Sequence, residues 1–387
     1  MVILKGKKNC SGCHACFNIC PAKAIEMQSD EEGFLYPAIS LNKCIQCNQC
    51  ENVCPVLHKP STFSMDLVFG CFAENKEDRM SSSSGGVFAV LARKILTVGG
   101  IVCGAALNDN LEVEHIIVDN EKELKRIKGT KYVQSRIGDT FQKLKQQLNT
   151  GRKVLFSGTP CQVAGLKKYL GKEYENLLCV DLICHGVPSP EVWKRYLMEL
   201  SGKNEVENVF FRKKQENNNI TMMEYYFSNG EIKKEVYGES PYIKGFIQNL
   251  YVRPSCFECQ FKGTKRCSDI TIGDFWSIKE YHPDFSDDYG TSAVIIHSEK
   301  GKQWFEKCNG SMAIVKATTK EVACWNECLL QSTKYNSQRE VFFEQWKDKS
   351  IAEVVLELSA KLQETKPQNE KKPLFSKLKC FVENKIR

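Results

Sequence analysis

Cysteines dominate the chemistry that this sequence could perform. Two runs within the first 55 residues share the spacing C-x2-C-x2-C-x3-C-P, and the second run begins at Cys44, 34 residues after the first begins at Cys10. Thiolates are soft, anionic ligands that suit iron. Three closely spaced cysteines can wrap one face of a cubane while a fourth comes from a distance. The duplicated run therefore predicts two [4Fe-4S] clusters.

The ligands of the two clusters are expected to cross between the runs, because the last cysteine of each run ligates the other cluster in two-cluster ferredoxins. The first cysteine set is then Cys10, Cys13, Cys16 and Cys54, and the second cysteine set is Cys20, Cys44, Cys47 and Cys50. A pair of zinc sites is the alternative, although zinc usually takes two separated C-x2-C pairs. Residues 1–58 resemble a bacterial two-cluster ferredoxin in every ligand position, with GFLYPAI as its short strand pair. This resemblance implies an α+β ferredoxin-like module.

Five further cysteines lie at turn-like positions in the rest of the chain. SGTPCQVAGL places Cys161 in the first turn of a predicted helix, directly after a strand, and DLICHGVPSP places Cys184 at the end of the next strand. The carboxyl ends of strands in one sheet face the same edge, so these two thiols are expected to approach each other. Cys256, Cys259 and Cys267 follow in PSCFECQFKGTKRC. They suffice for a third cluster; buried free cysteines with a small zinc knuckle are the alternative.

A serine- and glycine-rich turn, MSSSSGG at 80–86, precedes a predicted helix. Small residues let backbone N–H groups approach a phosphate, and the helix N-terminus adds partial positive charge. The string GTKYVQSR (129–136) could bring Lys131, Gln134, Ser135 and Arg136 to the same anion. A helix cap and an edge strand are the alternative interpretations. No dinucleotide-binding G-x-G-x-x-G follows a strand and no P-loop occurs.

The elements that must position these residues alternate between helix and strand over 65–330, which predicts a larger α/β domain with a mixed sheet. Asn229-Gly230 indicates a hairpin within 206–237. Residues 59–65 are predicted to be a linker, and 335–387 a helical extension whose tail after Glu364 is flexible or forms a basic amphipathic helix. The predicted strands cover 101–107, 111–119, 153–159, 176–184, 269–276 and 291–298, and the predicted helices cover 87–96, 121–129, 137–151, 160–171, 189–200 and 300–308.

The composition of the chain indicates where the protein is located and what kind of partner it binds. The chain has 387 residues, 20 cysteines and a formal net charge of +7. No apolar stretch approaches the roughly 18 residues of a membrane span, and the N-terminus lacks an apolar export signal. Metal ligation is therefore favoured over disulfides, and a cytoplasmic location is expected. The mild basic excess suits an acidic protein partner or an anionic cofactor, and no nucleic-acid partner is expected.

Six motifs in order make residues 65–330 resemble the family of beta subunits of coenzyme F420-reducing hydrogenases and dehydrogenases. They are SSSSGGVF, GTKYVQS, FSGTPCQVAGLKKYL, DLICHGVPSPEVWKRYL, SCFEC with FKGTKR, and SDITIGDFW. The resemblance implies that FAD binds at Ser83, Ser84, Gly85 and Gly86, with Lys131 and Tyr132 nearby. It also implies a third [4Fe-4S] cluster held by the third cysteine set, with Cys267 as the alternative fourth ligand; this set is Cys161, Cys184, Cys256 and Cys259.

The resemblance further implies a flavo-iron–sulfur oxidoreductase. Such a protein passes electrons between a hydride-carrying coenzyme, deazaflavin-like or unknown, and a one-electron carrier protein or partner oxidoreductase subunit. FAD suits this role because it accepts a hydride and releases single electrons. No catalytic residue is identified. The alternatives are a non-catalytic electron-transfer subunit that docks on a partner enzyme, for example in a surface-polysaccharide pathway, and a large domain that has lost its flavin.

Overall fold

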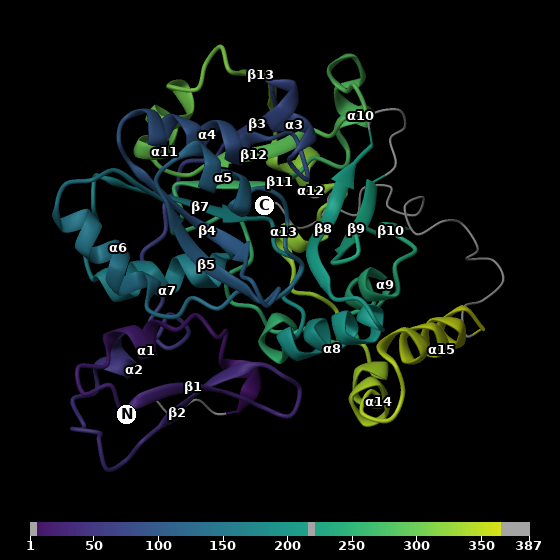
Figure 1. Ribbon diagram of the computed structural model, residues 1–387. Coiled ribbons are helices and arrows are strands. Elements are labelled where there is room, and N and C mark those ends of the chain that lie inside the picture. The colour runs from purple at the N-terminus through teal and green to yellow at the C-terminus, as the bar shows by residue number, and fades with distance from the viewer. Residues whose placement is uncertain (1–5, 216–220, 365–387) are drawn as a thin grey trace.

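The computed structural model of the chain describes residues 6–215 and 221–364, and its N-terminal module lies beneath a large sheet (Figure 1). Strands β1 and β2 of this module pair antiparallel, with Ile25 opposite Ile39, so the short strand pair that the sequence predicts is present. The ferredoxin-like topology itself stays a prediction. The module contains the elements η1 Lys7–Asn9, α1 Ala15–Ile19, β1 Ile25–Ser29, β2 Leu35–Ile39 and α2 Gln49–Asn52.

The larger region is built on a mixed eight-stranded sheet in the order β13-β3-β12-β11-β7-β6-β4-β5. The four strands β11, β7, β6 and β4 run parallel, and the strands outside them pair antiparallel. This confirms the predicted mixed sheet. The strands are β3 Leu67–Ala73, β4 Ile101–Leu107, β5 Val113–Val118, β6 Val154–Gly158, β7 Leu177–Leu182, β11 Ile270–Asp274, β12 Ser292–Ile296 and β13 Met312–Ala317.

Helices cover both faces of this sheet, as a parallel centre requires. On one face α4 (Val87–Thr97), α5 (Glu121–Ile127) and α11 (Glu299–Glu306) share an apolar core with the strands. On the other face, the core contains α6 (Thr140–Asn149), α7 (Pro160–Leu170) and also Cys13, Ala15 and Val53 of the N-terminal module. The module therefore packs on the α6–α7 face, and its first cysteine loop is part of a continuous core (Figure 1).

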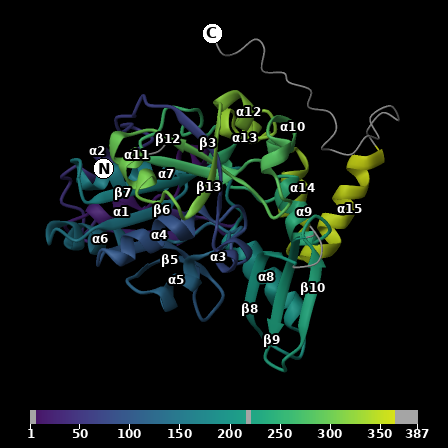
Figure 2. The same ribbon diagram turned by 90° about the horizontal axis from the view of Figure 1, so that it is seen from above.

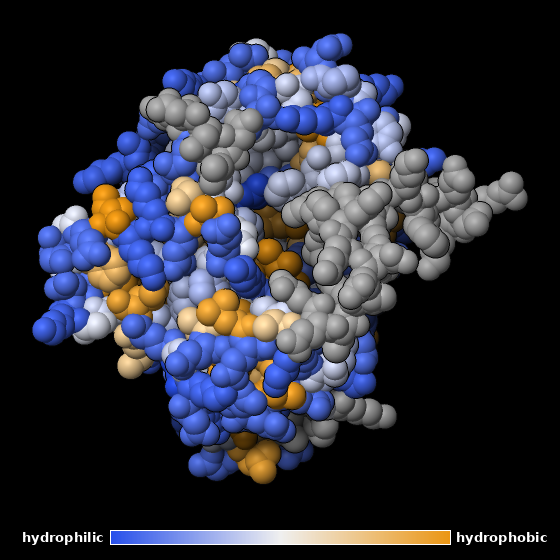
Figure 3. Space-filling model, turned by 90° about the vertical axis from the view of Figure 1, so that its right-hand side faces the viewer, coloured by the Kyte–Doolittle hydropathy of each residue, from blue (hydrophilic) through white to orange (hydrophobic). Residues whose placement is uncertain are grey.

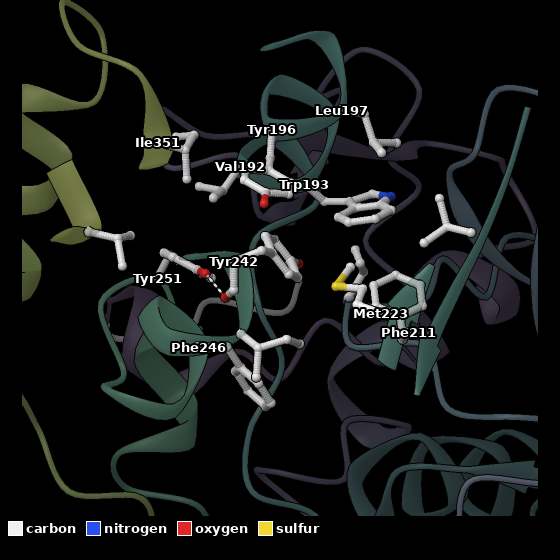
Figure 4. Close-up of a cluster of buried hydrophobic side chains, with 14 of the residues drawn as sticks. Val192, Trp193, Tyr196, Leu197, Phe211, Met223, Tyr242, Phe246, Tyr251 and Ile351 are labelled. Atoms are coloured by element: carbon white, nitrogen blue, oxygen red, sulfur yellow. Dashed lines mark hydrogen bonds between the residues drawn. The ribbon is translucent and has the colours of Figure 1, made fainter. Parts of the chain in front are cut away.

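A second, three-stranded antiparallel sheet projects to one side of the large sheet (Figure 2). It contains β8 Val206–Lys214, β9 Thr221–Phe227 and β10 Ile232–Val236. Asn229-Gly230 joins β9 to β10 as predicted, while the single strand expected before that turn is divided into β8 and β9. Aromatic residues of α8 (Pro190–Ser201), β8 and α9 (Pro241–Ile247) fill its core, where the Tyr251 hydroxyl donates to the Tyr242 carbonyl (Figure 4). Helices α14 (Gln338–Gln345) and α15 (Ile351–Glu364) close this core from outside.

Several elements were not expected from the sequence, and strand β3 is the most important because it lies between β13 and β12. The predicted C-terminal tail falls outside the described residues. Within the described ranges, no helix is both long and apolar enough to cross a membrane. The remaining elements are α3 Lys76–Met80, η2 Pro254–Cys256, α10 Ile278–Tyr281, η3 Pro283–Phe285, α12 Thr319–Ala323 and α13 Glu327–Leu330.

Candidate metal centres and anion site

The first cysteine set lies together where the N-terminal module meets the large domain. Cys10, Cys13 and Cys54 are buried, and Cys16 is half-buried. Burial, and then the charges on Cys10 and Cys54, raise the pKa of the Cys16 thiol to about 12. Burial therefore keeps these thiols protonated on their own, and a bound metal cluster would let them act as thiolates by drawing the negative charge onto iron.

The second cysteine set lines one cavity of the module, nearer the surface. Cys20, Cys44, Cys47 and Cys50 all face this cavity, whose other walls include the apolar side chains of strands β1 and β2. Cys47 is exposed. The loop around it contains two residues with left-handed backbone, Gln46 at φ 55° and Asn48 at φ 56°, which turn the chain tightly enough to point successive cysteines inward.

The third cysteine set lines another cavity, between the large domain and the module. Strands β6 and β7 are parallel neighbours, with Gly158 opposite Asp181, so the residues that follow them meet at one edge of the sheet. Cys161 follows β6 in the first turn of α7, and Cys184 follows β7. Cys256 and Cys259 come from η2 and the turn after it. Burial first, and then the charges on Cys259 and Cys184, raise the pKa of Cys161 to about 12.

Cys267 does not lie with these four thiols. It packs in the apolar core beneath the sheet, where its electrostatic neighbours are Asp181 and Cys179. Its position gives no support to the alternative in which Cys267 is the fourth ligand. Cys328, which was not among the predicted ligands, lies close enough to affect Cys184 electrostatically. Lys262 links the two, since its ammonium donates to the backbone carbonyls of both Cys184 and Cys328.

The first and third cysteine sets are brought together by close backbone contacts. Gly165 of α7 lies against Cys13, and a Cβ atom there would stand 2.9 Å from the Cys13 Cβ and 3.0 Å from its Sγ. Residues of the module, among them Asn9, Ser11 and Val56, also line the third cavity. Across this boundary Arg253 donates from Nε to the Cys10 carbonyl at 2.7 Å. The two sets therefore share one buried boundary.

The serine–glycine turn precedes helix α4, with Gly86 as its N-cap at φ 89°, as the sequence predicts. The segment 129–132 runs beside it, because the Thr130 backbone N–H donates to Ser83 Oγ at 2.8 Å. Gly85 has a structural role that the sequence did not reveal. A Cβ atom there would stand 2.7 Å from the backbone nitrogen of Ser292 and would also meet the Cys71 carbonyl, so the close approach is to strands β3 and β12.

Cationic side chains surround this turn. Arg79 pairs with Asp287 and Arg212 pairs with Asp274, whereas Lys131 and Lys214 form no ion pair among the described residues. Lys214 donates to the backbone carbonyls of Arg79, at 2.8 Å, and of Ser84. Burial, and then the charges of Arg79 and Arg212, lower the pKa of Lys214 to about 7. Burial alone lowers the pKa of Lys131 to about 7. The Lys131 ammonium donates hydrogen bonds only to backbone carbonyls. Among the described side chains, the buried Nε atoms of Arg79 and Arg212 have no hydrogen-bond partner. These groups together would accommodate an anion.

Aromatic residues stand beside the cations. Tyr132 packs against Phe211, Tyr237 and Phe246 and so belongs to the aromatic core. The Arg212 guanidinium pairs with Asp274 at 2.6 Å and lies 4.9 Å from the ring centroid of the half-exposed Trp276. The face on the side of β8–β10 is hollowed near its centre, with hydrophobic atoms inside a mostly hydrophilic rim (Figure 3).

His185, which stands next to Cys184, has a hydrogen-bonding role. Its Nε2 lies 2.7 Å from Asn249 Oδ1, and its ring meets Phe246 edge-on. Burial lowers the pKa of His185, and its hydrogen bond to Asn249 partly opposes this.

Within the described ranges, no three His, Cys, Asp or Glu side chains converge as the ligands of a single metal ion would. A [4Fe-4S] cluster needs a wider arrangement, because the four cysteine sulfurs that ligate it stand about 6–7 Å apart.

Sequence reasoning missed several residues at these sites. Arg253, Lys214, Lys262 and Cys328 come close to the predicted residues only through the folded topology. Arg253 alone had a usable signal, because it stands three residues before Cys256 in a segment already identified by its C-x2-C turn.

The chain is similar in sequence to proteins of known family. Residues 151–321 match the family described as the C terminus of the coenzyme F420 hydrogenase/dehydrogenase beta subunit, and residues 9–57 match the 4Fe-4S dicluster domain. The F subunit of the F(420)H(2) dehydrogenase of Methanosarcina mazei is 24% identical over 322 residues, which cover 79% of this chain and 84% of that relative. A chain of the F420-reducing [NiFe] hydrogenase complex from Methanosarcina barkeri aligns with a TM-score of 0.44 at 16% identity, covering 79% of this chain and 92% of that chain.

Proposed function

We propose that the chain is a member of the coenzyme F420 hydrogenase/dehydrogenase beta-subunit family, an oxidoreductase family, because residues 151–321 match the C-terminal model of that family and residues 9–57 match a 4Fe-4S dicluster domain. It passes electrons between a hydride-carrying coenzyme, either deazaflavin-like or of unknown type, and a one-electron carrier, and it does so with FAD and three [4Fe-4S] clusters. We place this activity in the cytoplasm and expect no nucleic-acid partner.

One observation carries the proposal: the twelve predicted cysteine ligands gather into three groups of four. The first set is buried at the domain boundary, the second lines a cavity of the module, and the third lines a cavity beside η2. All-thiolate groups of four are the donor chemistry that [4Fe-4S] clusters require. Each set would hold one cluster, and each ligand set keeps the assignment that the sequence predicts.

The serine–glycine turn would hold the phosphates of FAD. The supporting observations are the lysines with lowered pKa values, Lys131 and Lys214, and the orphaned buried Nε atoms of Arg79 and Arg212. A diphosphate near Ser83 and Ser84 would place negative charge beside Lys131 and Lys214, which bond only backbone carbonyls, and beside the two free Nε–H groups. Bound FAD would convert between hydride and single-electron transfer. The surrounding residues orient it and exclude water, with Trp276 as a half-exposed aromatic beside Arg212.

The second cysteine set faces the surface and is the proposed point of exchange with a partner. Cys47 is exposed there, and Leu41 and Ile45 of the same loop are 73% and 65% exposed. A small apolar patch beside a redox centre suits the small interfaces of transient electron-transfer complexes. The partner would be an electron-carrier protein or another oxidoreductase subunit.

The test is the cofactor content of the protein after anaerobic purification. We expect about twelve irons, matching acid-labile sulfide, and one FAD per chain. A Cys256→Ser variant should lose about four irons and keep the rest. A protein with eight irons or fewer and no flavin would refute the proposal for the large domain.

A non-catalytic electron-transfer subunit is the second candidate, because the Methanosarcina mazei relative is, by its name, one subunit of a dehydrogenase. The two candidates differ in one measurement. A catalytic chain alone should oxidise a reduced deazaflavin or nicotinamide coenzyme with an artificial one-electron acceptor. A docking subunit should hold the clusters but show no turnover until a partner is added.

A further inference from the structure

Arg253 is a completely buried arginine between the two inner cysteine sets. Its exposed fraction is 0%. It stands directly before η2, three residues ahead of Cys256 of the third set. Its Nε donates to the backbone carbonyl of Cys10, in the first set, at 2.7 Å. The side chain therefore spans the boundary between the large domain and the N-terminal module.

All hydrogen bonds of Arg253 go to neutral acceptors. Besides the Cys10 carbonyl, Nη2 donates to the Leu35 carbonyl at 3.0 Å and Nη1 donates to Gln134 Oε1 at 2.9 Å. The guanidinium also lies 4.2 Å from the ring centroid of Tyr36. Gly12 makes room for it, because a Cβ there would stand 2.9 Å from Nη1. Across residues 6–215 and 221–364, no carboxylate forms an ion pair with Arg253.

A buried guanidinium without an anionic partner is costly, since arginine keeps its charge in proteins. Anionic groups do lie nearby once the cysteines are thiolates. Arg253 interacts electrostatically with the sulfurs of Cys161 and Cys256, and it bonds the backbone of Cys10 directly. A cubane held by four thiolates carries net negative charge, which grows by one unit when it accepts an electron.

We propose that Arg253 is the shared counter-charge of the two inner clusters, so that it raises the reduction potentials of the clusters held by the first and third cysteine sets. This inference rests on the proposed function and deepens it. One electron adds to a cluster and no bond forms or breaks. The fixed positive charge stabilises the reduced form more than the oxidised form, while the second set, which makes no contact with Arg253 in the described structure, is affected little.

Gln134→Glu is the decisive variant because it is nearly isosteric. It places a carboxylate against the guanidinium at the position where Oε1 now accepts at 2.9 Å, and so cancels the charge without emptying the site, while the hydrogen bond that Nε2 donates to the Ser11 carbonyl at 3.1 Å is lost. In a redox titration followed by electron paramagnetic resonance, two of three midpoint potentials should shift to more negative values. Arg253→Gln should shift the same two in the same direction, and Arg253→Lys, which keeps the charge, should shift them least.

Gln147→Glu is the matched control. It adds the same charge on α6, where Gln147 accepts from Arg152 at 3.4 Å, outside the residues that line the third cavity. It should leave all three potentials unchanged. Unchanged potentials in Gln134→Glu, or an equal shift of all three signals, would overturn the role of Arg253 while leaving the clusters in place. Wild-type protein that assembles neither inner cluster would overturn both this inference and the proposed function.

Discussion

The ion pair between Glu32 and Arg339 should control how firmly the N-terminal module docks. Glu32 stands in the turn between β1 and β2, and Arg339 stands on α14. Arg339 binds both carboxylate oxygens, with Nη1 at 2.7 Å from Oε1, and the side chains are only 7% and 15% exposed. Its Nε also donates to the Val252 carbonyl at 3.1 Å. The pair thus connects the module to the segment that carries Arg253.

Replacing Arg339 with methionine would leave the Glu32 carboxylate nearly buried and unpaired. Breaking a fully buried pair costs about 3–5 kcal/mol. Because water still reaches part of the Glu32 carboxylate, the cost should be smaller here. We expect the variant to weaken docking of the module by about 2–3 kcal/mol. Since about 1.4 kcal/mol changes a population tenfold, the undocked state should become about 30- to 100-fold more populated.

Hydrogen–deuterium exchange measures this opening directly. Peptides that cover residues 30–36 and 337–343 should exchange about 30- to 100-fold faster in Arg339→Met, while peptides from the centre of the large sheet stay unchanged. Adding Glu32→Gln should restore part of the protection, because the unpaired charge is then gone.

Lys143→Met provides the control, since its pair with Asp139 is 59% and 54% exposed. Its effect should stay within about twofold. Equal effects of Arg339→Met and this control, or faster exchange over the whole chain, would refute the reasoning.

Three further outcomes are expected. Cys184→Ser should lose about four irons while Cys328→Ser keeps wild-type iron content; equal losses would mean that Cys328 is a ligand. FAD should bind more weakly as pH rises through about 7, where the half-buried Lys131 and Lys214 lose their protons, and calorimetry in buffers of different ionisation enthalpy should show proton uptake on binding. Gly85→Ala should destabilise the large domain by about 1–3 kcal/mol in thermal unfolding, because its Cβ meets backbone of two strands; an unchanged melting temperature would contradict this.

Local signals in the sequence were enough to place most elements and to predict that Cys161 and Cys184 follow neighbouring strands. Cys161 and Cys184 could be paired because each follows a buried strand, and parallel neighbours bring such residues to one edge. Strand β3 was missed because residues 67–73 form a short apolar run without alternation, which does not distinguish a strand from a buried helix segment. Cys267 was kept as an alternative because sequence spacing alone does not tell on which side of the sheet a side chain lies.

The partners of charged residues could not be predicted, because they depend on contacts between segments far apart in the chain. Lys214 reaches Ser84 across 130 positions, and Arg253 reaches Cys10 across 243. Neither contact has a local pattern. The close packing of Gly85 against β3 and β12 also depends on the register of the sheet, whereas the sequence offered only the phosphate interpretation.

Helix α7 sets the distance between two of the proposed redox centres. Cys161 stands in its first turn, and Gly165, four residues later, touches Cys13. Four residues of α-helix rise about 6 Å, a length fixed by backbone hydrogen bonds. One turn of α7 therefore fixes the distance between the third and first cysteine sets. Electron exchange should therefore tolerate insertions in the predicted linker at 59–65. One residue inserted between Cys161 and Gly165 would instead rotate the contact by about 100° and separate the two proposed centres.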